Sequence, residues 1–199
     1  MFYAGRVGQL SFYSAEARAP RVADLAGLLC GPGQAVSFGR GTAARVSVVV
    51  AEPWRAHALA LCYAERGVHA DVRRSEEGHP VVRTPFRADL AGLAGAWLRG
   101  AVKAVPDGFE LDGSALRVWV VASGRAEATG YLLGLDPHAP DTHEPLVAVL
   151  ARSGLPAIVH GARSGAPALR VTGRRRLRRL AELVGGTPPG VDERAWPAA

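Results

Sequence analysis

The sequence is poor in the residues that mark several common protein classes. Its 199 residues include two cysteines, Cys30 and Cys62, too few for a disulfide scaffold, and we expect both to be buried thiols. No apolar stretch approaches the ~20 residues of a membrane helix. Residues 1–20 lack the basic head and apolar run of a secretory signal. We therefore expect a cytoplasmic protein, and the 48% hydrophobic and 21% charged residues are typical of a globular chain.

Lysine is almost missing, because Lys103 is the only one among 24 basic residues and the others are arginine. A GC-rich genome explains an excess of arginine. A nucleic-acid partner explains it too, because the guanidinium binds phosphate through two parallel hydrogen bonds. Residues 1–87 carry a net charge of +4, residues 88–151 of −4 and residues 152–185 of +7. Codon usage does not require this segregation, so the distribution favours a partner of negative charge.

Two segments of the chain resemble each other at a constant spacing. Residues 67–83 match residues 154–170 at an offset of 87 without gaps, with shared glycines, a shared proline and a terminal arginine. Residues 45–51 match residues 117–123 at an offset of 72, so the second copy has 15 additional residues between these matches. We place that insertion in the loop Leu135–Pro145, which contains three prolines. The chain is thus predicted to be an internal duplication.

Turn residues and apolar periodicity predict the order αββαββα in each copy, an α+β fold class. The first copy is expected to contain a helix at 24–31, strands at 34–38 and 45–51, a helix at 53–66, strands at 68–73 and 80–84, and a helix from residue 89. The second is expected to contain a helix ending near residue 105, strands at 109–111 and 116–122, a helix interrupted by the insertion, strands at 155–160 and 168–171, and a helix at 173–184. The predicted organisation is an N-terminal arm or strand (1–21), two repeats (22–95 and 96–186) and a flexible tail (187–199).

The first predicted helix carries a recognisable motif. Its sequence LAGLLCGPG, Leu25–Gly33, resembles the name motif of the LAGLIDADG homing endonucleases. The resemblance implies that two motif helices pack along a pseudo-twofold axis through small residues. It also implies that the antiparallel sheets of the two repeats form a DNA-binding saddle, and that the last acid of each motif holds a metal ion at its floor.

Two further segments are similar to the WhiA-type sporulation regulators, which carry degenerate LAGLIDADG repeats. These are WLRGAVKAV at 97–105, taken as the second motif helix, and ALRVTGRRRLRRLAELVGG at 168–186. The resemblance implies DNA binding without cleavage. Members of that family have a helix-turn-helix after the repeats, whereas residues 187–199 here are short and proline-rich.

The positions of the motif acids argue against catalysis. The acid of the first motif is replaced by Pro32, and that of the second by Val105, or by Gly100 if the repeats are aligned differently. None of these side chains ligates Mg²⁺, which takes oxygen ligands. We therefore expect no nuclease activity and no cofactor. A cluster at Asp136, His138, Asp141 and His143 has the composition of a metal site, but its prolines indicate a loop and we expect no metal there.

Strand alternation predicts where a nucleic acid is held, because alternate side chains share one face. The repeat makes Arg45 equivalent to Arg117 and Arg83 equivalent to Arg170. The predicted nucleic-acid-binding residues are Arg40, Arg45, Arg73, Arg74, Arg83, Arg117, Trp119, Arg163 and Arg170. Trp119 stacks on a base in this hypothesis, or else fills the core. The competing interpretation is a solvated sheet face whose arginines pair with neighbouring acids.

The last predicted helix carries a second basic surface, made of Arg174, Arg175, Arg176, Arg178 and Arg179. Such a surface is solvated, or it holds phosphates or an acidic protein partner. The sequence as a whole predicts a monomeric pseudo-dimer that binds double-stranded DNA without cutting it, in a regulatory role in bacteria. The alternatives are a protein-interaction module for an acidic partner and an RNA-binding protein.

Overall fold

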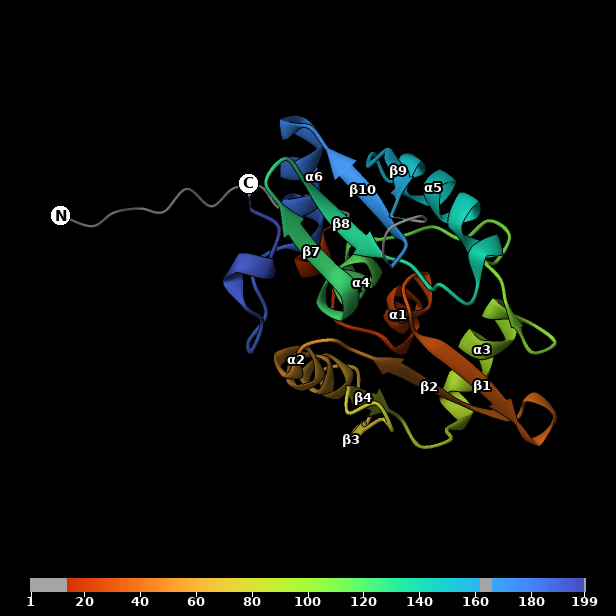
Figure 1. Cartoon of the computed structure of the whole chain (residues 1–199). Coiled ribbons are helices and arrows are strands. Elements are labelled where there is room, and N and C mark those ends of the chain that lie inside the picture. Colours follow the sequence, from red (N-terminus) through yellow and green to blue (C-terminus); the bar gives the residue numbers. More distant parts are fainter. Residues whose placement is uncertain (1–13, 162–165, 199) are drawn as a thin grey trace.

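Two halves of similar architecture make up the protein. The computed structural model describes residues 14–161 and 166–198 (Figure 1). The first half contains α1 (Ala26–Cys30), β1 (Gln34–Phe38), β2 (Ala43–Val49), α2 (Pro53–Ala64), β3 (Asp71–Arg74), β4 (Pro80–Arg83) and α3 (Ala91–Trp97). The second contains α4 (Gly113–Ser123), β7 (Gly124–Glu127), β8 (Gly130–Gly134), α5 (His143–Arg152), β9 (Ala157–His160), β10 (Ala168–Thr172) and α6 (Arg174–Val184). A short hairpin of β5 (Leu98–Arg99) and β6 (Val102–Lys103) lies between the halves.

Short 3-10 helices complete the described structure, at Ala15–Ala17, Val22–Leu25, Gly39–Gly41, Ala88–Leu90, Pro140–Thr142 and Glu193–Ala195. Within residues 14–161 and 166–198, every helix is too short or too polar to cross a membrane.

The predicted duplication is confirmed in both topology and hydrogen bonding. The two antiparallel sheets have the equivalent strand orders β1-β2-β4-β3 and β7-β8-β10-β9. Gly67 and Gly154, 87 residues apart, end α2 and α5 with φ angles of 67° and 79°, a left-handed conformation that glycine adopts without strain. The following amides bond back identically, from Val68 to Tyr63 and from Leu155 to Leu150, at 3.0 and 2.9 Å. The offset of 87 therefore describes a true structural repeat.

The second predicted match, at the offset of 72, is wrong. Residues 117–123 lie in the helix α4, not in a strand, and residues 97–105 form the end of α3 and the β5–β6 hairpin, not a motif helix. The segment LRVWVVAS contains several β-branched residues, which favour strands. It nevertheless forms a helix because Asp112 caps its first turn, with its carboxylate accepting from the Ala115 amide at 2.9 Å. A helix that is apolar on nearly all sides is a buried one.

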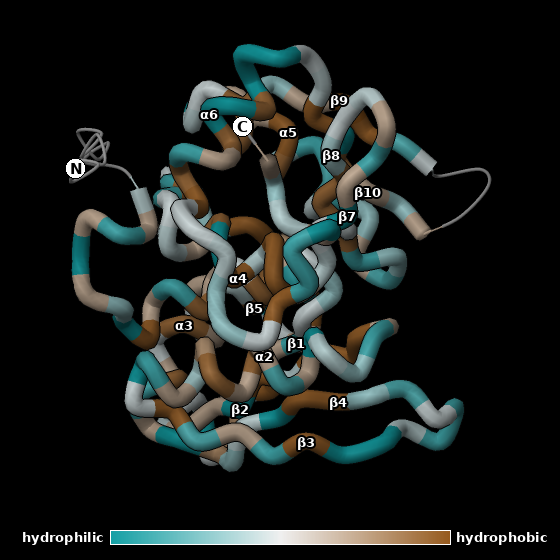
Figure 2. Tube along the Cα trace, turned by 90° about the vertical axis from the view of Figure 1, so that its left-hand side faces the viewer, coloured by the Kyte–Doolittle hydropathy of each residue, from teal (hydrophilic) through white to brown (hydrophobic). Residues whose placement is uncertain are grey.

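The helices α1 and α4 pack against each other between the two sheets (Figure 1). Their backbones come so close at Gly27 that a Cβ there would lie 1.9 Å from the Ala115 carbonyl oxygen. Leu25, Leu28 and Trp119 are fully buried around this contact. Figure 2 shows the hydrophobic stretch of α4 in the interior of the trace. Gly27, a small residue of the motif, thus has the predicted role of letting the two central helices come into contact.

Each sheet has helices on one face only. In the first sheet, α2 contacts β3 and β4 while α3 contacts β1 and β2; in the second, α5 contacts β9 and α6 contacts β10. Along β2, Ala44, Val46 and Val48 are buried while the alternate residues are partly or fully exposed. This alternation is that of an antiparallel sheet with one face packed and one face solvated.

The tail, expected to be flexible, contacts the second half at Ala195 and Trp196. Trp196 is buried and its indole N–H donates to the Gly185 carbonyl at 2.9 Å. The Tyr131 hydroxyl donates to the Ala195 carbonyl at 2.6 Å. Both cysteines are buried free thiols, as expected. Most of the predicted N-terminal arm, residues 1–13, lies outside the described residues.

Replacing Gly27 by alanine tests the contact between α1 and α4. The added methyl group forces the two backbones apart, and we expect Gly27→Ala to lower the free energy of unfolding by at least ~2 kcal/mol. Gly92→Ala in α3 is the matched control, because a Cβ there meets nothing within 4 Å and alanine raises helix stability by ~0.5–1 kcal/mol. Urea unfolding followed by circular dichroism measures both. Equal stabilities for the two variants would contradict the close contact.

Candidate nucleic-acid interface

The uncovered face of the first sheet carries three of the predicted arginines. Cross-strand pairing puts Arg83 opposite Ser47 on one side and opposite Asp71 on the other. Arg45 lies on the same face, two residues from Ser47, and Arg73 lies there too, two residues from Asp71. Asp71 lies 3.9 Å from Arg73, so part of the positive charge on this face is balanced.

The uncovered face of the second sheet carries two arginines in one row. Arg125, Leu132, Arg170 and Ile158 are paired across the four strands. The Arg170 guanidinium lies 3.0 Å from the Glu127 carboxylate. Arg125 is exposed and has no side-chain partner among the described residues. Sequence reasoning missed Arg125 because it placed the strand at 116–122, and the signal was present in Gly124 and Gly130, which bracket a short β-hairpin arm.

Aromatic rings accompany the arginines on the first sheet. Phe38, 63% exposed, and Phe86, 41% exposed, have ring centroids 5.1 Å apart. The Arg45 guanidinium lies over the Phe86 ring at 4.8 Å. An exposed cluster of rings and guanidinium groups is suited to stacking as well as to phosphate contacts.

Arg74 and Arg40 lie elsewhere than on the two uncovered faces. Arg74 is paired with Pro80 and therefore lies on the opposite side of β3 from Arg73, since neighbours in a strand alternate. Arg40 is exposed in the β1–β2 turn, with a φ of 60°. Arg163 lies outside the described residues.

Arg117 and Trp119 were predicted on a strand of the saddle, and this placement is wrong because both lie on α4. The Arg117 guanidinium donates to the carbonyls of Val184 and Gly186, at 2.5 and 2.7 Å. It therefore caps the end of α6. Trp119 is fully buried and its indole N–H donates to the Gly134 carbonyl at 2.8 Å. Its ring is part of the core and does not reach a bound base.

A buried lysine stands at the C-terminal end of α1. The Lys103 ammonium donates to the carbonyls of Gly31 and Gly33, at 2.6 and 2.8 Å, and lies 3.0 Å from the Asp136 carboxylate. The side chain of Gln34, on β1, donates to the same carboxylate. Burial lowers the pKa of Lys103, and the Asp136 charge opposes this effect. One ammonium group thus joins α1 to the loop that follows β8.

A buried arginine stands at the C-terminal end of α4 in the same way. The Arg55 guanidinium, from α2, donates to the carbonyls of Val121 and Gly124 at 2.8 and 2.6 Å. Its Nε also donates to Glu52 at 2.5 Å. Each central helix therefore ends at a side-chain cation, which complements the negative end of the helix dipole.

The residues at these helix ends do not fit a divalent metal ion. Pro32 follows α1, and Ser123 and Gly124 end α4, so neither helix end supplies a carboxylate. The Asp136 carboxylate lies near the C-terminal end of α1 through its contact with Lys103, and Lys103 neutralises it. Across residues 14–161 and 166–198, no three His, Cys, Asp or Glu side chains gather as metal ligands. A divalent ion entering here would meet two fixed positive charges instead of anionic oxygens.

The predicted metal-like cluster of the 136–143 loop is engaged in local structure. Asp136 accepts from the His138 amide at 2.9 Å, and the His143 ring nitrogen lies 2.8 Å from the Asp136 carbonyl oxygen. These contacts shape the loop.

The second basic surface lies on α6, which packs on the covered face of the second sheet. It comprises the predicted residues Arg174, Arg175, Arg176, Arg178 and Arg179. All five fall within the first two turns of the helix and line a groove of about 890 Å³ beside Gly154 and Pro156. Glu182, 3.7 Å from Arg179, is the one acid in that groove lining. This surface is therefore strongly positive and separate from the uncovered sheet faces.

Removing the Lys103 ammonium tests its role at the end of α1. Lys103→Met leaves the Asp136 carboxylate buried without its counter-charge, so we expect a loss of about 3 kcal/mol in the free energy of unfolding. Lys103→Met combined with Asp136→Asn should recover at least half of the loss, because the stranded charge is removed. Arg99→Gln, exposed on the same hairpin, should cost less than ~0.5 kcal/mol. Urea unfolding measures all three, and additive losses in the double variant would refute the pairing.

Comparison with protein-family models and with curated proteins finds no match. Among solved structures, the chain is similar to the homing endonuclease I-WcaI bound to its DNA recognition sequence, with a TM-score of 0.57 and 12% identity over 90% of this chain and 89% of that one. It is similar to the N-terminal LAGLIDADG domain of DUF199/WhiA, with a TM-score of 0.55 and 10% identity over 92% and 86% of the two chains. It also covers 58% of full-length DUF199/WhiA from Thermatoga maritima, with a TM-score of 0.56 and 10% identity over 92% of this chain. The paired central helices and the two matching sheets therefore form the LAGLIDADG fold that the motif at Leu25–Gly33 indicates.

Proposed function

We propose that the protein binds double-stranded DNA without cutting it, through the uncovered faces of its two sheets. The observation that carries this proposal is the placement of Arg45, Arg73 and Arg83 on one uncovered face and of Arg125 and Arg170 on the other. A solved protein of the same fold is described as bound to its DNA recognition sequence. The proposal transfers that mode of binding to this chain.

The composition of these faces suits backbone contacts. The two faces together carry five arginines and two acids, Asp71 and Glu127, so they are positive. A DNA phosphate can replace the acid in the weak ion pairs Arg73–Asp71 and Arg170–Glu127. An arginine on a partly exposed surface gains little from its protein carboxylate partner. It gains more from a phosphate whose condensed counterions are released on binding. The exposed rings of Phe38 and Phe86 add apolar contact with sugars or bases.

The absence of cleavage is proposed from the ends of the central helices. Metal-assisted hydrolysis of a phosphodiester needs metal ions held by anionic oxygens beside the scissile bond. In this chain Lys103 and Arg55 stand at those helix ends, and Asp136 is committed to Lys103. We propose a regulatory role in bacteria, in which the protein acts by occupying its DNA site without cutting it.

A second candidate function is docking of an acidic protein partner on the second basic surface. The supporting observation is that Arg174, Arg175 and Arg178 have no side-chain partner among the described residues. This candidate places the partner on α6, away from the uncovered sheet faces. Binding to RNA at the sheet faces is the remaining alternative, and a preference for single strands would favour it.

The salt dependence of DNA affinity tests the sheet faces. If about five phosphates are contacted, log affinity falls against log salt with a slope of about −4 to −5. Arg45→Gln with Arg83→Gln removes two phosphate contacts, so the slope should become shallower by about 2 and affinity should fall at every salt concentration. Fluorescence anisotropy with a labelled duplex measures both quantities.

Arg74→Gln is the matched control for that experiment, because Arg74 is on β3 beside Arg73 but on the opposite side. We expect its slope to equal that of the unchanged protein. A double variant with unaltered slope, or no binding to any duplex at about 50 mM salt, would reject the sheet faces and favour a protein partner.

Incubation with supercoiled plasmid tests the absence of cleavage. With excess Mg²⁺ or Mn²⁺ we expect no conversion to nicked or linear DNA, because the helix ends offer cations where metal ligands are needed. Agarose gels over several hours give the readout. Metal-dependent nicking that Asp136→Asn abolishes would overturn the proposal.

A further inference from the structure

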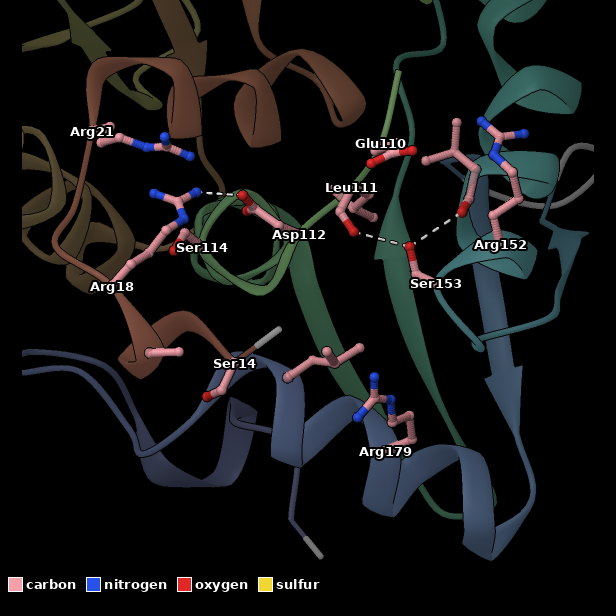
Figure 3. Close-up of a pocket in the computed structure, with 13 residues that line it drawn as sticks. Ser14, Arg18, Arg21, Glu110, Leu111, Asp112, Ser114, Arg152, Ser153 and Arg179 are labelled. Carbon is pink, nitrogen blue, oxygen red and sulfur yellow. Dashed lines mark hydrogen bonds and ion pairs between the residues drawn. The ribbon is translucent and has the colours of Figure 1, made fainter. Parts of the chain in front are cut away.

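A cavity of about 680 Å³ lies at the N-terminal end of α4, the end opposite to the one that Arg55 caps. Figure 3 shows α4 end-on, with Arg18 and Arg21 from the N-terminal segment on one side, Arg152 and Ser153 from the end of α5 on the other, and Arg179 from α6 below. Four stretches distant in sequence therefore contribute side chains to one partly open cavity.

The cavity has an excess of positive charge. Four arginines line it, against two acids, Glu110 and Asp112. Arg18 is already paired with Asp112 and with the buried Asp24. Arg21 has no side-chain partner among the described residues, and Arg152 donates to a neutral group, the Phe109 carbonyl, at 3.0 Å. The guanidinium groups of Arg21 and Arg152 are suited to an anion with several oxygens.

Ser114 supplies an independent sign of a ligand. It lines the cavity, is 3% exposed, and its hydroxyl has no hydrogen-bond partner in the described part of the chain. Because this hydroxyl borders the cavity and has no protein partner, a ligand oxygen there replaces solvent as its hydrogen-bond partner. Ser114 is also in the first turn of an eleven-residue helix, where the Asp112 carboxylate caps the Ala115 amide and the other backbone N–H groups of the turn lack helical acceptors. The Ser114 hydroxyl, the N-terminus of α4 and the arginines thus all favour an anion with several oxygens.

The rest of the lining limits the size and polarity of the ligand. Leu111, Val149 and Leu183 give one part of the wall an apolar surface. The volume is in the range of sites for small organic molecules, roughly 300–1,000 Å³. We propose that this cavity binds a small phosphorylated molecule of about mononucleotide size. Its phosphate contacts Ser114 and Arg21, and its apolar body packs against the leucines. This site is independent of DNA binding at the sheet faces.

Isothermal titration calorimetry on the full chain tests the site with three probes: pyrophosphate, adenosine monophosphate and adenosine. Adenosine monophosphate should bind with a Kd below ~1 mM, and adenosine at least ~10-fold more weakly, because hydrogen bonds to a charged group supply most of the affinity. Ser114→Ala and Arg21→Gln should each weaken the nucleotide by about 5- to 10-fold. Ser114→Ala removes one oxygen atom and Arg21 is exposed, so thermal melting should confirm that both variants fold.

Arg194→Gln is the matched control, an exposed arginine outside the cavity whose replacement should leave the Kd unchanged. Three results would overturn the proposal. One is that neither phosphate probe binds. Another is that Ser114→Ala and Arg21→Gln bind the nucleotide as the unchanged chain does. The third is a loss of binding in Arg175→Gln, which would place the phosphate on the second basic surface of α6.

Discussion

The contact between α1 and α4 at Gly27 is the constraint on which the rest of the structure depends. Because the two backbones touch, the helices act as one unit, and each sheet is fixed relative to the other through them. Acidic side chains lie near the N-terminal ends of these two helices and cations at their C-terminal ends, as the helix dipoles favour. Arg18 bridges Asp24 and Asp112 near the helix beginnings, whereas Lys103 and Arg55 meet the carbonyls at the ends. Of these ions Asp24, Lys103 and Arg55 are buried, and their contacts hold the two helices in one register.

The two ends of the central helices adjoin different proposed sites. The end of α1, where Lys103 is paired with Asp136, adjoins Gln34, at the start of β1 and on the uncovered face of the first sheet, so the proposed DNA interface has a rigid floor. The opposite end of α4 adjoins the cavity beside Ser114. An eleven-residue helix spans about 16 Å, so the two proposed sites are a helix length apart. The basic surface of α6 shares Arg179 with the lining of that cavity.

How far the sequence predicts the structure depends on how local each signal is. The alternation around Arg45 and the glycines at 67 and 154 identify strands and helix ends directly, and the structure confirms them. The helix α4 was missed because a fully buried helix has no polar face, and its valines are typical of strands. That error displaced Arg117 and Trp119 and concealed Arg125. Lys103 was not foreseen because two of its three partners are backbone carbonyls, which no residue pattern marks.

The burial of Lys103 has a consequence for the chemistry of the whole surface. It is the chain's only lysine, and it is 6% exposed. Reagents and enzymes that acylate ε-amino groups therefore find no accessible target on the native fold, and amine-directed coupling or cross-linking is restricted to a free α-amino group. The positive potential of this protein rests on guanidinium groups, whose charge is insensitive to pH in the physiological range and beyond the reach of lysine acetylation.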